Sequence, residues 1–321
     1  FVCNEGNFTF GNASLSFFDP AAGTVENQVF FNTNGFPPGD VAQSMTLRDS
    51  LGYIVMNNSG KIMVINIHNF KHRGTIKGLT SPRHMLIKDE TTAYVTDLYS
   101  RSIAIINPAT LTVTGHIEVG ASTEQILQVG NHLVANSWSF NRMIYKIDPE
   151  TEQVTDSLEV ALQPNSMVCD AEGKLWVLSD GAYAGSPAGT ENPALTRIDP
   201  GTFTVEKVFT FPAPEGSPTR LTINPHGDTL LYLGGGWGYG PTETGGIFIQ
   251  PVGSDSLHTA PLVPSRGHRF YGLAVDPGDG TLYASDAMDF TRKGWVYRYS
   301  PSGTAIDSFQ AGITPSAFCF K

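Results

Sequence analysis

A pattern of roughly 40 to 55 residues recurs seven times along this chain, and this repetition limits the fold more than any other feature. Each unit has an apolar strand, a tight polar turn, a second apolar strand, a long loop, and a third strand that in most units runs into an Asp-Pro or similar turn. The second strands open with Val2-Cys3-Asn4, Tyr53-Ile54-Val55, Tyr94-Val95-Thr96, Leu133-Val134-Ala135, Leu175-Trp176-Val177, Leu231-Tyr232-Leu233 and Leu282-Tyr283-Ala284. A period of this length is typical of a four-stranded propeller blade. The sequence therefore predicts an all-β, seven-bladed β-propeller with four-stranded antiparallel blades, formed by residues 1–321 as a single domain.

The two ends of the chain carry incomplete units that complement each other. Residues 1–3 begin at the second-strand position, so the first unit has no inner strand, whereas residues 316–320 form an inner strand with nothing after it. We expect these two segments to pair and close the ring, which would leave no open sheet edge. Closure would also bring Cys3 and Cys319 into one blade, where a disulfide between them is an open alternative. Cys169 is interpreted as a small buried hydrophobe.

Composition excludes several classes of function. The net charge of −10 argues against nucleic acid as a partner. No apolar run is as long as the stretch of about 18 residues that is needed to span a bilayer. No signal peptide is visible, and Phe1 opens directly on a strand, so the sequence reads as a mature or trimmed chain.

The sequence contains no recognised catalytic or metal motif. The Gly-rich run at 234–240 precedes no helix and lacks the Lys-Ser/Thr of a phosphate loop, so it is interpreted as a rim loop that displays two aromatic rings. The segment 276–280 resembles a calcium loop only faintly, because the downstream Glu is missing. The eight histidines are scattered, and G-x-S-x-G and H-E-x-x-H are both absent. We therefore expect no catalytic residue, no bound metal and no cofactor.

One face of the predicted ring differs from the other in its side chains. The turns between first and second strands and between third and fourth strands are short and rich in Asp, Gly and Pro. On the opposite face, the loops between second and third strands are long and aromatic, and the connections between blades add arginines. Aromatic rings in solvent loops favour a ligand surface, and arginine beside aromatic rings suits a flat or anionic ligand. The predicted ligand-binding residues are Arg83, Tyr99, Trp138, Phe140, Arg220, Trp237, Tyr239, Arg269 and Tyr271.

Two structural alternatives stay open for these residues. The rings can pack on neighbouring blades, and the arginines can pair with acids on the same face, which include Glu5, Glu124 and Asp180.

Several segments resemble a known family along the whole length of the chain. Residues 2–8, 13–20, 81–83, 122–125 and 317–321 are similar to the YncE-like propeller surface lipoproteins of Bacteroidetes, often called surface-layer proteins. The resemblance implies a seven-bladed propeller at the outer-membrane surface, with a lipid anchor in the precursor, that acts as a monomer apart from a TonB-dependent receptor. Members of this group capture metal chelates, either ferric catecholate siderophores or cobalamin, and pass them to that receptor.

The function expected from the sequence is accordingly that of a non-enzymatic protein that binds a ferric siderophore. The rings would stack on the ligand, and Arg83, Arg220 and Arg269 would offset its negative charge. Cobalamin is the second candidate. A metal-dependent lactonase-like enzyme and a glycan-binding or adhesion module are alternatives of other classes.

Overall fold

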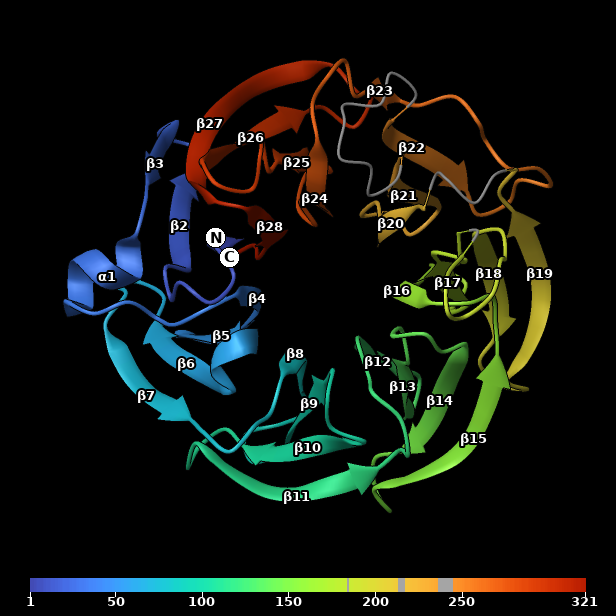
Figure 1. The fold of residues 1–321 in the computed structure, drawn as a ribbon, viewed down its shortest axis with the longest axis horizontal. Coiled ribbons are helices and arrows are strands. Elements are labelled where there is room, and N and C mark those ends of the chain that lie inside the picture. Colours follow the sequence, from blue (N-terminus) through green and yellow to red (C-terminus); the bar gives the residue numbers. More distant parts are fainter. Residues whose placement is uncertain (184, 213–216, 236–244) are drawn as a thin grey trace.

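Seven antiparallel sheets of four strands each surround a central channel in the computed structural model of the protein (Figure 1). The structure describes residues 1–183, 185–212, 217–235 and 245–321. This arrangement confirms the seven-bladed propeller that the repeats predict.

The strands nearest the channel and their hydrogen-bonded neighbours form the inner half of each blade. The inner strands are β28 (Pro315–Phe318), β4 (Ala42–Arg48), β8 (Pro82–Ile87), β12 (Ile126–Val129), β16 (Pro164–Cys169), β20 (Thr219–Ile223) and β24 (Phe270–Val275). The second strands are β1 (Val2–Asn4), β5 (Leu51–Met56), β9 (Ala93–Asp97), β13 (His132–Asn136), β17 (Leu175–Ser179), β21 (Thr229–Gly234) and β25 (Leu282–Asp286). We number the blades 1 to 7 in this order.

The outer half of each blade contains the third and fourth strands. The third strands are β2 (Ser14–Asp19), β6 (Lys61–Asn66), β10 (Ser102–Asn107), β14 (Met143–Asp148), β18 (Ala194–Asp199), β22 (Gly246–Pro251) and β26 (Lys293–Tyr299). The fourth strands are β3 (Thr24–Glu26), β7 (His72–Ile76), β11 (Thr112–Glu118), β15 (Gln153–Glu159), β19 (Thr204–Thr210), β23 (Val263–Pro264) and β27 (Ala305–Ile313).

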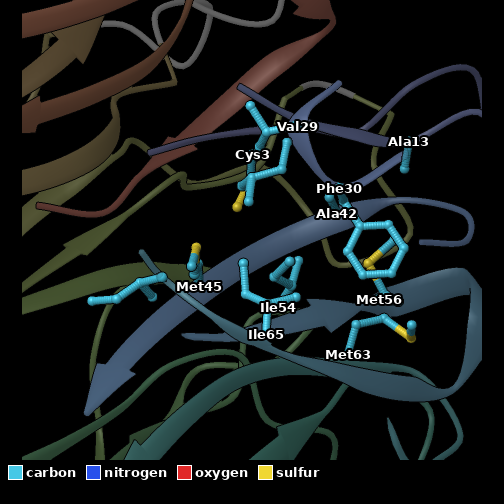
Figure 2. Close-up of a cluster of buried hydrophobic side chains, with 12 residues drawn as sticks. Cys3, Ala13, Val29, Phe30, Ala42, Met45, Ile54, Met56, Met63 and Ile65 are labelled. Carbon is cyan, nitrogen blue, oxygen red and sulfur yellow. The ribbon is translucent and has the colours of Figure 1, made fainter. Parts of the chain in front are cut away.

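The hydrophobic core lies between neighbouring blades. Second strands such as β9 and β17 are buried along their whole length because each packs against a blade on both faces. Outer strands such as β11 alternate between exposed and covered residues, as expected for a strand with one solvent face. The core cluster in Figure 2 joins blades 1 and 2 through Cys3, Ile54 and Met63.

A short helix, α1 (Val29–Asn34), was not anticipated from the sequence. It follows β3 at the outer edge of the ring (Figure 1) and buries Val29 and Phe30 in the core between blades 1 and 2. A short 3-10 turn, η1 (Asn57–Ser59), follows β5. Among the described residues, neither helical segment has the length and apolar character needed to cross a membrane.

Ring closure takes place in blade 1, where β1 pairs with β28. Val2 lies opposite Phe318 and Cys3 lies opposite Ala317. The amino group of Phe1 donates a hydrogen bond to the carbonyl of Cys319 at 2.7 Å, and the amide of Cys319 donates to the carbonyl of Phe1 at 3.0 Å. Closure by the two chain ends is therefore confirmed. The cysteines are all free, so the structure contains no Cys3–Cys319 disulfide.

Removal of residues 316–321 should destabilise the whole domain, because it deletes most of the inner strand of blade 1 and exposes the edge of β1. We expect a large fall in melting temperature or the loss of a cooperative transition by circular dichroism. Removal of Lys321 alone, which is exposed, is the matched control and should change little. An unchanged melting temperature after the longer truncation would contradict this account of closure.

Candidate functional site

A cavity of about 530 Å³ lies at the mouth of the channel, on the face that carries the long loops. Its wall is formed by residues at the start of the inner strands, and its edge by the loops between second and third strands. Phe8 comes from the β1–β2 loop, Tyr99 from the β9–β10 loop, Trp138 from the β13–β14 loop and Phe290 from the β25–β26 loop. The predicted difference between the two faces thus coincides with a real concavity.

Irregular strand pairing supplies the side chains of the cavity wall. In six blades the inner strand shifts register against the second strand close to the channel mouth. Such a bulge adds a residue to one strand and redirects its side chain. The residues at these irregularities that line the cavity are Gln43, Arg83, His84, Asn165, Arg220 and Tyr271.

Arg83 and Glu124 form a two-pronged ion pair across the boundary between blades 3 and 4. Nε and Nη2 of Arg83 each donate to a carboxylate oxygen of Glu124 at 2.7 Å, and Nη1 donates to Oε1 of Gln43 at 2.7 Å. Burial alone would raise the pKa of Glu124, but the Arg83 guanidinium outweighs burial and holds that pKa below its usual value. The charge of Arg83 is therefore compensated by the protein itself, which is the structural alternative left open for the arginines.

His84 adds no positive charge to this wall at neutral pH. Its Nε2 lies 3.9 Å from an oxygen of Glu124. Burial nevertheless lowers the pKa of His84 to about 4, with Glu124 only partly opposing the shift.

Arg220, Tyr271 and Glu5 occupy the opposite wall, across blades 6, 7 and 1. Nε of Arg220 donates to the carbonyl of Tyr271 at 3.1 Å, and its guanidinium lies 5.3 Å from the centre of the Tyr271 ring. The Tyr271 hydroxyl donates to Glu5, with its oxygen 3.2 and 3.3 Å from the two carboxylate oxygens. Burial raises the pKa of Glu5, and the positive charge of Arg220 opposes that shift.

Trp138 is held in position by a buried acid. Its indole Nε1 donates to Oδ2 of Asp180 at 2.6 Å, and the amide of Asn165 donates to the other carboxylate oxygen. Burial raises the pKa of Asp180 to about 6, although both hydrogen bonds favour the ionised form. The ring is thus fixed by a polar contact, while its face remains part of the cavity lining.

The edge of the cavity is rich in exposed aromatic rings. Tyr99 is 75% exposed and Phe8 is 64% exposed, which is unusual for side chains of this size. Phe290 packs edge-on against Tyr271 with ring centres 5.3 Å apart. Phe290 therefore packs within its own blade and Trp138 contacts the neighbouring blade 5 through Asp180, whereas Phe8 and Tyr99 face solvent.

The nine predicted ligand-binding residues do not all meet at the cavity. The structure places five of them in its lining, namely Arg83, Tyr99, Trp138, Arg220 and Tyr271. Phe140 is exposed in the same loop as Trp138 but is not a lining residue, and Arg269 stacks on Phe290 at 5.7 Å from outside the lining. Trp237 and Tyr239 lie outside the described residues.

Several lining residues were absent from the predicted set. Glu5 and Glu124 contribute the two carboxylates, Thr314 contributes a buried hydroxyl, and Phe8 and Phe290 contribute rings. The sequence signal for these residues was their place in the repeat. Glu5 directly follows β1, Glu124 and Thr314 come just before the inner strands β12 and β28, and Phe8 and Phe290 lie in loops between second and third strands. Among the described residues, no three His, Cys, Asp or Glu side chains come together as metal ligands.

The charges that line the described part of the cavity balance. The lining holds Arg83 and Arg220 against Glu5 and Glu124. Such a wall offers hydrogen-bonding groups in fixed positions but no large net charge, so it favours a ligand whose own net charge is small.

Comparisons with known proteins support the fold and leave the activity open. The profile described as "Domain of unknown function (DUF5074)" matches residues 1–320. No curated protein matches the sequence.

Solved structures resemble the chain at low sequence identity. A hydrazine synthase chain of Kuenenia stuttgartiensis is similar with a TM-score of 0.71 and 15% identity, covering 86% of this chain and 88% of that one. A quinoprotein alcohol dehydrogenase-like protein of Bacteroides thetaiotaomicron has a TM-score of 0.69 and 15% identity, covering 98% of this chain and 76% of that one. Virginiamycin B lyase of Staphylococcus aureus has a TM-score of 0.62 and 15% identity, covering 87% of this chain and 88% of that one. At this identity the likeness concerns the fold alone.

Replacement of Glu124 by Gln should lower the free energy of unfolding by about 1.5–3 kcal/mol, because it leaves the largely buried Arg83 without its countercharge. The double variant Arg83→Met with Glu124→Leu removes both charges and should lose less stability than Glu124→Gln alone. Urea denaturation of the three proteins measures both quantities. If the single variant is as stable as wild type, the ion pair does not hold this wall.

Ionisation of Asp180 should make stability depend on pH. Its pKa is about 6 in the folded protein, against about 3.9 in an unfolded chain. Between these values the folded state holds a proton that the unfolded state has lost, so this group stabilises the fold at low pH and loses that contribution as the pH rises through 6. The full difference is roughly 3 kcal/mol.

The contribution of Asp180 is measured by denaturation from pH 4 to 8. Asp180→Asn cannot ionise, so its free energy of unfolding should lack the fall seen in wild type. Asp156→Asn, on the exposed outer strand β15, should retain it. Parallel pH profiles for wild type and Asp180→Asn would refute the assignment.

Proposed function

The chain belongs to the family described as a domain of unknown function (DUF5074), and we propose that it is a non-enzymatic binding protein that captures a small molecule at the channel mouth. One observation carries this proposal: a cavity of about 530 Å³ whose polar wall is fixed by internal hydrogen bonds and whose edge displays exposed aromatic rings. A preorganised polar wall with apolar rings is the usual character of a ligand site.

The ligand class we propose is a metal chelate with a flat aromatic or conjugated surface. The resemblance to surface lipoproteins supports the class, and the rings of Tyr99 and Trp138 support the flat surface. The cavity would hold one part of the chelate while the rings at its edge contact a face of it.

Charge balance bears on which chelate is bound. A ferric tris-catecholate carries three negative charges, whereas cobalamin carries a single phosphodiester on a mostly uncharged body. Since Arg83 is neutralised by Glu124, the described wall favours the chelate of lower charge. We therefore place cobalamin ahead of the ferric siderophore, which reverses the order expected from the sequence.

The cellular setting remains part of the proposal. The resemblance alone supports an outer-surface location, a lipid anchor in the precursor and transfer of the ligand to a TonB-dependent receptor. Co-purification of a receptor with the full-length lipoprotein would test that setting separately from ligand binding.

Separate titrations with cobalamin, ferric enterobactin and calcium, followed by tryptophan fluorescence, test the proposed function. We expect saturable quenching by cobalamin and little response to calcium. Saturable quenching by ferric enterobactin and not by cobalamin would make the siderophore the preferred candidate ligand. No quenching by either chelate would refute chelate capture.

Trp138→Ala should weaken chelate binding by about 1–3 kcal/mol if the ring is a central contact. Asp148→Ala, at the end of β14 on the opposite face, is the control and should bind as wild type. Calorimetry with the chelate that binds measures both. A loss in Asp148→Ala with Trp138→Ala unaffected would place the site on the other face.

A further inference from the structure

The two arginines of the cavity differ in the groups that they contact directly. Arg83 donates two hydrogen bonds to the carboxylate of Glu124. Arg220 donates its Nε to the backbone carbonyl of Tyr271 and stacks on that residue's ring. In the part of the chain that the structure describes, Arg220 makes no ion pair. Its Nε and its stacking on the Tyr271 ring fix its position, so its terminal nitrogens remain available to a ligand.

The backbone around Arg220 indicates that its position is imposed. Arg220 has a φ of 61°, in the left-handed region that a residue with a long side chain seldom adopts. It sits where β20 shifts register against β21. A conformation of this kind costs free energy and concentrates at functional sites.

A buried hydroxyl without a partner among the described residues lies in the same cavity. Thr314, which precedes β28, is 3% exposed and lines the cavity, and its Oγ1 has no hydrogen-bond partner in the part of the chain that the structure describes. A buried hydroxyl without a partner is costly unless a ligand or water completes it. Thr314 is linked to Glu5 through the bond from the Glu5 amide to its carbonyl at 2.9 Å, and Glu5 in turn contacts Tyr271.

We propose that Arg220 binds one singly charged oxyanion group of the ligand, a carboxylate or a phosphodiester, at the wall formed by blades 6, 7 and 1. This inference rests on the proposed binding function and adds a requirement to it: the ligand must present one such group beside its flat surface. The other arginine cannot take part without giving up Glu124, so the site accepts a single anion.

Glu5 opposes the bound anion and provides an internal check. Its carboxylate accepts a hydrogen bond from the Tyr271 hydroxyl of β24, and the positive charges of Arg220 on β20 and Arg83 on β8 act on it. An ionised Glu5 repels an anion bound at Arg220, so removing the charge of Glu5 should strengthen anion binding. Removing the charge of Arg220 should weaken it. Damage to the cavity would instead weaken binding in both variants.

Benzoate, methyl phenyl phosphate and benzamide are the probes. The first carries a carboxylate, the second a singly charged phosphodiester, and benzamide is an uncharged match for benzoate. Ligand-observed nuclear magnetic resonance titrations with wild type, Arg220→Gln, Glu5→Gln and Arg101→Gln give the affinities. Arg101 lies on the exposed β9–β10 loop and donates to the carbonyl of Gly120, so its variant is the control.

In wild type, at least one anionic probe should bind about tenfold or more tightly than benzamide. Arg220→Gln should abolish that preference, Glu5→Gln should increase it several-fold, and Arg101→Gln should leave it unchanged. The better of the two anions identifies the oxyanion.

Equal affinity for all three probes, or an equal loss of anion affinity in Arg220→Gln and Glu5→Gln, would overturn the anion subsite. The chelate titrations test the proposed function independently of that result. Failure of every probe at millimolar concentration would also overturn the subsite. Strong cobalamin binding that is unchanged in Arg220→Gln would do the same and leave chelate capture intact.

Discussion

The pairing of β1 with β28 is the contact on which the rest of the molecule depends. Blade 1 is assembled from both ends of the chain, so the seven blades acquire fixed positions around the channel only when this pair forms. The same contact builds part of the cavity, because Glu5 follows β1, Thr314 precedes β28, and the two are joined by a backbone hydrogen bond. The contact that closes the ring therefore also places the part of the cavity wall that Glu5 and Thr314 form.

The bulges at the channel mouth explain how a repetitive scaffold carries an individual site. A bulge redirects a side chain from the regular pleat of the strand, and in five blades the side chains at the bulges line the cavity. The positions are structurally equivalent but chemically different: Gln43, Arg83, Asn165, Arg220 and Tyr271. Ligand chemistry can thus change residue by residue without any change in the fold.

The sequence predicted the ring and its closure because both follow from local periodicity and from two incomplete units. It did not predict α1, six residues long with no helix-start signal. It named Arg83 as a ligand residue and Glu124 as one of the acids with which the arginines can pair, but it could not say which pair forms, since contact between residues 41 positions apart depends on how adjacent blades sit. Phe140 was expected at the site, yet its loop turns through a left-handed φ of 53° and its side chain is not among those lining the cavity.

The contrast between Arg83 and Arg220 shows that the attraction of a cavity for an anion depends on which arginines are paired with acids, and not only on how many arginines it holds. An ion pair taken out of water gains little net stability, because desolvation offsets its attraction. The Arg83 pair is therefore better understood as a rigid polar wall than as a source of affinity. An arginine held by a backbone carbonyl and a ring keeps its charge for a ligand. With one arginine of each kind, the cavity can recognise a single anionic group while remaining nearly neutral toward the rest of the ligand.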